Sequence, residues 1–66
     1  MNLLLNGESR HFDTALTLAE LLATLDLAGK RVAVELNGDI APRSQHASTT
    51  LQNGDRVEIV HAIGGG

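Results

Sequence analysis

Three Asn-Gly dipeptides, at positions 6–7, 37–38 and 53–54, constrain the fold of this chain more than any other feature of its sequence. Both residues tolerate positive φ, so Asn-Gly between apolar runs is the strongest short-range signal for a tight reversal. The first dipeptide separates residues 1–5 from residues 9–13, and these two segments are predicted to pair as a hairpin. The chain is therefore predicted to fold around short strands that are joined by tight turns.

Two later segments, residues 32–36 and 56–61, alternate apolar and polar residues with the period of a strand. A shorter segment, residues 39–41, is limited to an edge of the sheet by Pro42, which cannot donate a hydrogen bond to a neighbouring strand. The alternation directs one set of side chains toward the core, namely Met1, Leu3, Leu5, Phe12, Val32, Val34, Leu36, Val57 and Ile59.

One strong helical pattern follows the hairpin. Thr17 and Glu20 have the spacing of a capping box, which predicts that the helix begins directly after Thr17. Gly29 is placed to end the segment in the left-handed conformation. Four leucines form one apolar stripe at helical spacing, namely Leu18, Leu21, Leu22 and Leu25.

The order of these elements predicts an α+β fold. One helix must cover the apolar face of a mixed sheet of four or five strands, because neither layer can bury itself. Hairpin, helix and further strands in this order match the β-grasp, or ubiquitin-like, arrangement, with the first and last strands parallel at its centre. Residues 43–52 are polar and irregular, with about one helical turn and Leu51 as an anchor. Residues 1–63 are predicted to form one domain, and residues 64–66 a flexible glycine tail.

Composition excludes several classes of function. A chain of 66 residues buries only about 60% of its surface on folding, too small a core to enclose the roughly 300–1,000 Å³ pocket of an autonomous enzyme. The net charge is −3 and the basic residues are scattered, so no nucleic-acid partner is predicted. The absence of cysteine argues against disulfides and favours a cytoplasmic location. The short apolar runs predict no membrane span and no signal peptide.

No residue pattern indicates catalysis or a metal site. The three histidines, His11, His46 and His61, lie in separate segments without ligand spacing and are expected at the surface or rim of the fold. Ser44 lies close to His46 in sequence, but nothing orients the imidazole as its base. We therefore predict no catalytic residue, no metal ligand and no cofactor held by this chain itself.

The last three residues, Gly64, Gly65 and Gly66, directly follow the final predicted strand. Three residues extend at most about 10–11 Å, enough to enter the active site of a partner while the body docks outside. Glycine has no Cβ, so a narrow channel can close around its backbone. A frayed terminus is the alternative interpretation, and the sequence pattern leaves both open.

The alternation also leaves apolar side chains on the sheet face that points away from the helix. Leu4, Ala33, Val60 and Ala62 are predicted to point outward there, with Ile63 at the rim. Scattered exposed apolar residues are ordinary, whereas a contiguous patch marks a docking surface. Our hypothesis is that Leu4, Val60, Ala62 and Ile63 form a docking surface beside the exit of the tail.

A family resemblance is carried by residues 32–43 and 53–66. Its most specific part combines Asn-Gly-x-Ile-x-Pro-Arg with a Gly-Asp-strand-Gly-Gly ending. In these motifs, and over essentially its whole length, the chain resembles the ThiS family of sulfur carrier proteins of thiamine biosynthesis. A Gly-Gly ending alone is weak evidence, because several β-grasp carriers share it, and the additional Gly64 is compatible with the family.

The resemblance implies a protein cosubstrate and not an enzyme. A ThiF-type adenylyltransferase, which would hold the ATP and Mg²⁺, would adenylate the carboxylate of Gly66. Persulfide sulfur from a cysteine desulfurase would displace AMP and leave a thiocarboxylate. Thiazole synthase would then draw this sulfur into the thiazole ring. Gly64 and Gly65 would give the tail passage into the active sites of these partners.

Two alternatives stay open on sequence alone. Another carrier of the same fold, such as the small subunit of molybdopterin synthase, is typically longer and has a proline shortly before its Gly-Gly. This chain has His61, Ala62 and Ile63 in that region. A non-covalent ubiquitin-like adaptor would have an inert tail and would keep binding its partner after removal of Gly66.

Overall fold

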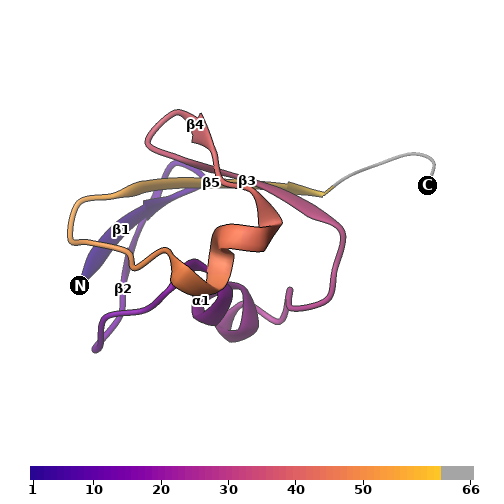
Figure 1. Cartoon of the computed structure of the whole chain (residues 1–66). Helices are drawn as coiled ribbons and strands as arrows, with labels where there is room; N and C mark the ends of the chain where they lie inside the picture. Colours follow the sequence, from indigo (N-terminus) through magenta and orange to yellow (C-terminus); the bar gives the residue numbers. More distant parts are fainter. Residues whose placement is uncertain (62–66) are drawn as a thin grey trace.

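The computed structural model describes residues 1–61. Within them, five strands form one mixed sheet in the order β2-β1-β5-β3-β4, and helix α1 packs across one face (Figure 1). The elements are β1 Asn2–Leu5, β2 Glu8–His11, α1 Leu18–Thr24, β3 Val32–Leu36, β4 Asp39–Ile40, the 3₁₀ helix η1 Arg43–Ser48, and β5 Arg56–His61. The predicted α+β arrangement of a helix across a mixed sheet is confirmed.

Strand β5 occupies the middle of the sheet. It runs parallel to β1, with Leu5 beside Val57. On its other side it pairs antiparallel with the whole length of β3, from Leu36 opposite Val57 to Val32 opposite His61. The predicted parallel pairing of the first and last strands is therefore confirmed, and His61 ends a strand that is supported on both sides.

The Asn-Gly dipeptides form turns of two kinds. In the turns β1–β2 and β3–β4 both residues have positive φ, 49° and 82° for Asn6 and Gly7, and 53° and 90° for Asn37 and Gly38. This is the two-residue reversal that matches the twist of a hairpin. In the third dipeptide only Gly54 has positive φ, at 91°, as in a type II turn. All three predicted reversals are present.

Helix α1 begins as predicted and ends earlier than predicted. The Thr17 amide donates to Glu20 Oε1 at 2.8 Å, and the Glu20 amide donates to Thr17 Oγ1 at 3.1 Å, which completes the capping box. The helix ends at Thr24, and the left-handed residue that follows its C-cap is Asp26, with φ 61°. Gly29 is left-handed as predicted, with φ 77°, but it lies beyond the end of the helix. The amides of Asp26 and the following leucine close a Schellman motif on carbonyls one turn back, at 3.0 and 2.7 Å.

The core lies between α1, η1 and the sheet. Leu51 is buried as predicted, and Phe12, Val32 and Leu36 are half-buried against the core. The sequence pattern anticipated the composition of the buried cluster, which consists of Leu3, Leu5, Leu18, Leu21, Leu22, Val34, Leu51, Val57 and Ile59.

His46 contradicts the expectation of a surface or rim position. Its side chain is buried, with 7% of its surface exposed, and its Nε2 lies 2.8 Å from the carbonyl oxygen of Ala41. The 3₁₀ helix η1 packs against α1, and this packing turns the imidazole inward. The hydrogen bond to Ala41 satisfies the buried nitrogen, as burial of a polar group requires. Neighbouring Ser44 is exposed, as expected.

Candidate functional site

The candidate site comprises the end of β5 and the sheet face that points away from α1 (Figure 1). Several residues predicted for this site lie outside the described residues. They are the predicted modified residue Gly66, the tail residues Gly64 and Gly65, and the docking residues Ala62 and Ile63. Within the described residues, the site therefore consists of the folded body that precedes residues 62–66.

Leu4 and Val60 lie on the same face of the sheet but do not adjoin along it. Val57 and Ile59 are buried, so the residues that alternate with them on β5 face away from α1. Leu4 and Val60 have 40% and 61% of their surfaces exposed. Leu4 is beside Arg56, four positions before Val60, which corresponds to about 13 Å along the strand.

Ile40 belongs to the same face and was missed by the sequence analysis. Its side chain has 68% of its surface exposed, and it pairs with Glu35 across β3 and β4. The signal was available, because a two-residue Asn-Gly turn fixes which residues oppose each other in a hairpin. We define the outer face by six residues: Leu4, Ala33, Glu35, Ile40, Glu58 and Val60.

The outer face also carries negative charge. Glu35 lies directly opposite Glu58 in the antiparallel pair β3–β5, and like charges in this position destabilise a sheet. The salt-bridge contact found within residues 1–61 joins His11 Nε2 to Asp13 Oδ1, at 3.3 Å, and involves neither glutamate. By the same alternation Arg56 lies on this side of the sheet, two positions before Glu58. The face thus combines exposed apolar side chains with two carboxylates, and within residues 1–61 Arg56 forms an ion pair with neither.

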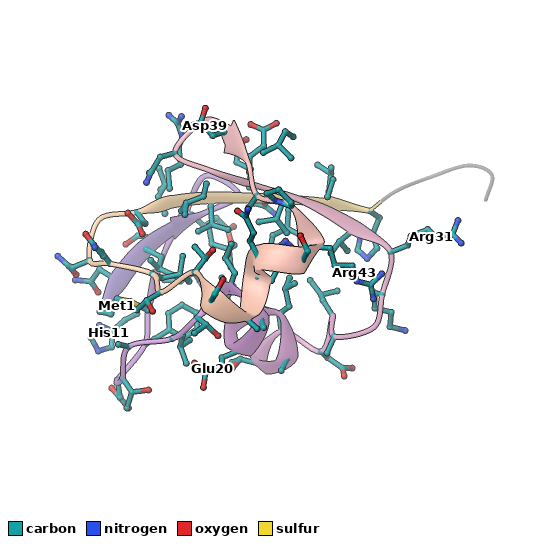
Figure 2. The ribbon with its side chains drawn as sticks, in the orientation of Figure 1. Met1, His11, Glu20, Arg31, Asp39 and Arg43 are labelled. Carbon is teal, nitrogen blue, oxygen red and sulfur yellow. The ribbon has the colours of Figure 1, made fainter. Side chains whose placement is uncertain are left out.

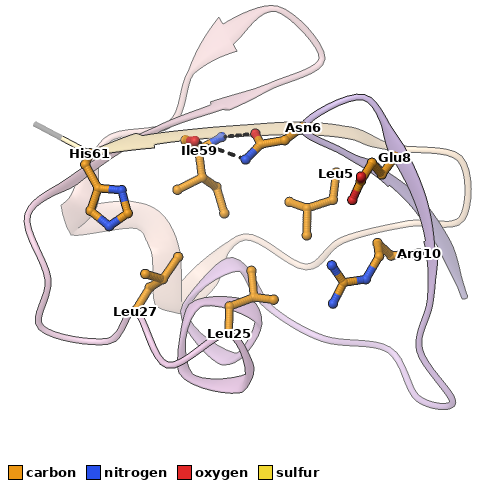
Figure 3. A pocket seen from close by; sticks show the side chains of 8 residues that line it. All are labelled: Leu5, Asn6, Glu8, Arg10, Leu25, Leu27, Ile59 and His61. Atoms are coloured by element: carbon orange, nitrogen blue, oxygen red, sulfur yellow. Dashed lines mark hydrogen bonds between the residues drawn. The ribbon is translucent and has the colours of Figure 1, made fainter.

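The side chain of Asn6 holds β5 on its β1 side. Its Nδ2 donates to the Ile59 carbonyl at 3.2 Å, and its Oδ1 accepts from the Ile59 amide at 2.7 Å (Figure 3). The amide group therefore continues the ladder between β1 and β5 beyond the point at which the main chain of β1 turns away.

The side chain of Asn37 holds β5 on the opposite side. Its Oδ1 accepts from the Arg56 amide at 2.9 Å, and its Nδ2 donates to Asp55 Oδ1 at 3.1 Å. Its own amide donates to the Arg56 carbonyl at 2.8 Å. The sequence predicted turns at both Asn-Gly dipeptides, but not these contacts, which exist only once β5 lies between the two hairpins.

A groove of about 250 Å³ lies between the end of α1 and the sheet (Figure 3). A second hollow, of about 330 Å³, lies beside β4. Ligand pockets typically have volumes of roughly 300–1,000 Å³. The first volume is below this range, and the second is close to its lower limit. Apolar and charged side chains surround the first groove: Leu5, Leu25, Leu27 and Ile59 form apolar walls, and Glu8, Arg10 and His61 lie at its ends.

Charged and metal-ligating side chains are dispersed over the described surface. Figure 2 shows His11, Glu20, Arg31 and Asp39 pointing outward from separate parts of the chain. His11 Nδ1 lies 2.8 Å from Asn2 Oδ1. Among residues 1–61, no three His, Cys, Asp or Glu side chains are grouped as a metal site, and none of the helices there has the length and apolar character to span a membrane.

Comparison with known proteins decides the family. The sequence model of the ThiS family matches residues 3–66. The chain belongs to the ThiS family. It is 33% identical over 66 residues to the sulfur carrier protein ThiS of Escherichia coli (strain K12), and the match covers 100% of both chains.

Solved structures support the same assignment. The crystal structure of the thiamine biosynthesis protein (ThiS) from Geobacter metallireducens is similar to the whole of this chain, with a TM-score of 0.87, 40% sequence identity and 100% coverage of both chains. The β-grasp, ubiquitin-like fold predicted from the element order is thereby confirmed. The ThiS assignment also decides against the alternative carrier of the same fold.

This chain also resembles a part of two larger proteins. The chain is 44% identical to a thiazole synthase of Paramagnetospirillum magneticum over 66 residues, which is 100% of this chain and 20% of that protein. The chain therefore spans about a fifth of the length of the thiazole synthases that it matches.

Proposed function

We propose that this chain is a sulfur carrier of thiamine biosynthesis that acts as a protein cosubstrate and not as an enzyme. The family assignment carries this proposal, since the ThiS family model matches residues 3–66. The sulfur carrier protein ThiS of Escherichia coli aligns with 100% of the length of this chain, and that of Bacillus subtilis aligns with 76% of it. The proposed location of the reaction is the cytoplasm.

In the proposed reaction the carboxylate of Gly66 is first activated. A carboxylate is anionic at neutral pH and is therefore a poor electrophile. A ThiF-type adenylyltransferase, which holds ATP and Mg²⁺ in its own site, joins this carboxylate to AMP and releases pyrophosphate. The acyl-adenylate contains a good leaving group, so its carbonyl carbon becomes open to attack by sulfur.

Sulfur then replaces AMP. The terminal sulfur of a persulfide, supplied by a cysteine desulfurase, attacks the acyl carbon and expels AMP. A thiol cleaves the resulting sulfur–sulfur bond, which leaves a thiocarboxylate on Gly66 and a disulfide on the donor side. Thiazole synthase takes the sulfur, and the carboxylate returns for another cycle. Two thiazole synthases that contain a segment 44% and 41% identical to this chain support this partner.

The geometry of the body supports delivery of a reactive tail. Strand β5 lies between β1 and β3, and Asn6 and Asn37 bind it from both sides. A partner that binds the outer face therefore meets His61 at a fixed place. Residues 62–66 can span at most about 18 Å from there, which would let the carboxylate of Gly66 enter the active site of a docked partner. Gly64 and Gly65 offer no side chain to obstruct it.

The direct test is an intact-mass measurement. The protein is incubated with ATP, Mg²⁺, the adenylyltransferase, a cysteine desulfurase, cysteine and a thiol reductant. We expect the mass to change by the replacement of one oxygen with one sulfur, and fragmentation to locate the change at Gly66. The reaction without ATP is the control and should give no change. An unchanged mass with partners that modify another ThiS protein would contradict the carrier function and favour an adaptor.

Substitution of Val60 tests the proposed docking surface. Val60→Arg places a long cationic side chain in the apolar part of the outer face. Val60 has 61% of its surface exposed. The KM for the adenylyltransferase is expected to rise about tenfold or more, which corresponds to ~1.4 kcal/mol. The unfolding free energy should change by less than about 0.5 kcal/mol, as for most surface substitutions.

The matched control is Ala47→Arg, which places the same side chain at an exposed position of η1, outside the strands of the outer face. This variant should keep the KM of the unmodified protein. An equal KM for Val60→Arg and Ala47→Arg would remove Val60 from the docking surface and would leave the proposed chemistry at Gly66 untouched.

A further inference from the structure

Strand β2 forms an edge of the sheet whose outer side is open. On its inner side, the amide of Phe12 donates to the Met1 carbonyl at 2.8 Å, and the Met1 amino group donates to the Phe12 carbonyl at 2.7 Å. Along an antiparallel ladder, residue pairs that exchange two hydrogen bonds alternate with pairs that exchange none. Arg10, two residues before Phe12, therefore also forms its main-chain hydrogen bonds with β1. The amides and carbonyls of Ser9 and His11 consequently point away from β1. All residues of β2 are exposed.

We propose that β2 of one copy pairs antiparallel with β2 of a second copy, about a two-fold axis through Ser9. The Ser9 amide of each copy donates to the Ser9 carbonyl of the other, and the two sheets become continuous. In this register Glu8 of each copy lies opposite Arg10 of the other. These residues form non-hydrogen-bonded pairs, in which facing side chains approach most closely.

The charges of β2 select this register among the possible two-fold arrangements. An axis through Glu8 would place Glu8 opposite Glu8, and an axis through Arg10 would place Arg10 opposite Arg10. An axis through His11 would place Arg10 opposite Phe12. The axis through Ser9 alone gives two pairs of opposite charge, which stabilise facing strands, whereas like charges destabilise them.

The same charges explain why the edge is selective. Charged side chains that point inward on an edge strand normally prevent pairing with other chains. Glu8 and Arg10 point toward the α1 side, where both line the groove of Figure 3. Neither forms an ion pair within residues 1–61. A second β2 strand supplies the missing partner for both side chains, while a strand without this alternation of charge does not.

The geometry of the sheet keeps this interface separate from the carrier site. Strand β1 lies between β2 and β5, so pairing at β2 leaves the outer face around Val60 and the end of β5 open. The opposite edge, β4, has only two residues and is followed by Pro42 after one further residue. The proposed interface is short, and interfaces below about 1,200 Å² are typical of weak, transient association.

Charge reversal tests the pairing. Sedimentation equilibrium up to millimolar protein should show a monomer–dimer equilibrium for the unmodified chain. Glu8→Arg and Arg10→Glu should each weaken dimerisation by about tenfold or more, because two attractive pairs become repulsive. An equimolar mixture of the two variants should regain the affinity, since every facing pair is again opposite in charge. A monomeric unmodified chain, or a mixture as weak as its components, would overturn the proposal.

A disulfide test locates the axis. The chain has no cysteine, so Ser9→Cys introduces a single thiol. Hydrogen-bonded residues that face each other across antiparallel strands have Cα atoms about 5.5 Å apart, within the range of about 4.4–6.8 Å for a disulfide. Oxidation should yield a covalent dimer of this variant much faster than of Ala47→Cys, the control on exposed η1. Equal rates for the two variants would place the contact elsewhere. Circular dichroism checks that each variant folds.

Discussion

Deletion of Gly66 is expected to abolish thiocarboxylate formation and to leave the stability of the body unchanged. The deletion withdraws the terminal acyl carbon by one residue, or about 3.3–3.6 Å. A displacement of only about 1 Å at a reacting centre can lower the rate about 100-fold, so the loss should be at least that large. The buried core is formed by residues between Leu3 and Ile59, and its unfolding midpoint should stay at the value of the unmodified chain.

The matched variant is Gly66→Ala, which keeps the length of the tail and adds one methyl group. If a narrow channel closes around the tail, this Cβ should also lower the rate, but less than the deletion does. The readouts are the sulfur content by intact mass and the binding of the adenylyltransferase. Undiminished sulfur loading of the deletion variant would refute the role of Gly66. A deleted chain that still binds and activates its partner would indicate an adaptor.

The parts of the fold that sequence analysis predicted depend on local signals. Positive φ at Asn6 and Asn37 is encoded in the dipeptides themselves. The start of α1 at Thr17 depends on two side chains three residues apart, and both hydrogen bonds form. The alternation of β5 is equally local, and it placed Val57 and Ile59 correctly in the core.

The parts that were predicted incorrectly, or not predicted at all, depend on packing between distant segments. The helix ends at Thr24, before Gly29, because the backbone bonds of a Schellman motif close at Asp26 and Leu27 packs against the core. His46 is buried because η1 packs on α1, and no spacing of ligand residues signals such a contact. Asn6 binds Ile59 although 53 positions separate the two residues in sequence.

For the candidate site, local signals predict which residues face outward, but not which of these residues are neighbours in the sheet. The exposure of Leu4 and Val60 followed from alternation alone. Their separation follows from the register of β1 against β5, in which Leu4 lies beside Arg56. The juxtaposition of Glu35 and Glu58 depends on the register of β3 against β5. Parallel and antiparallel registers of distant strands have no turn to fix them, so a single sequence gives little information about them.

Leu21→Ala is expected to have the largest effect on stability. Leu21 is fully buried between α1 and the sheet, and truncation of a buried leucine to alanine costs about 2–5 kcal/mol. At roughly 0.05–0.15 kcal/mol per residue, a chain of this size has a total stability of only about 3–10 kcal/mol. The variant should therefore be partly or largely unfolded at moderate temperature. Urea denaturation followed by far-ultraviolet circular dichroism measures the loss, since the chain contains neither Trp nor Tyr.

Leu4→Ala is the matched control, because it removes the same atoms from a side chain that is 40% exposed on the outer face. It should cost less than about 1 kcal/mol, since these atoms already contact water. The two variants should also separate stability from docking. Leu21→Ala should load sulfur normally per folded molecule, whereas Leu4→Ala should stay folded and raise the KM for the adenylyltransferase. Equal losses of stability in both variants would contradict the division of these leucines between the core and the outer face.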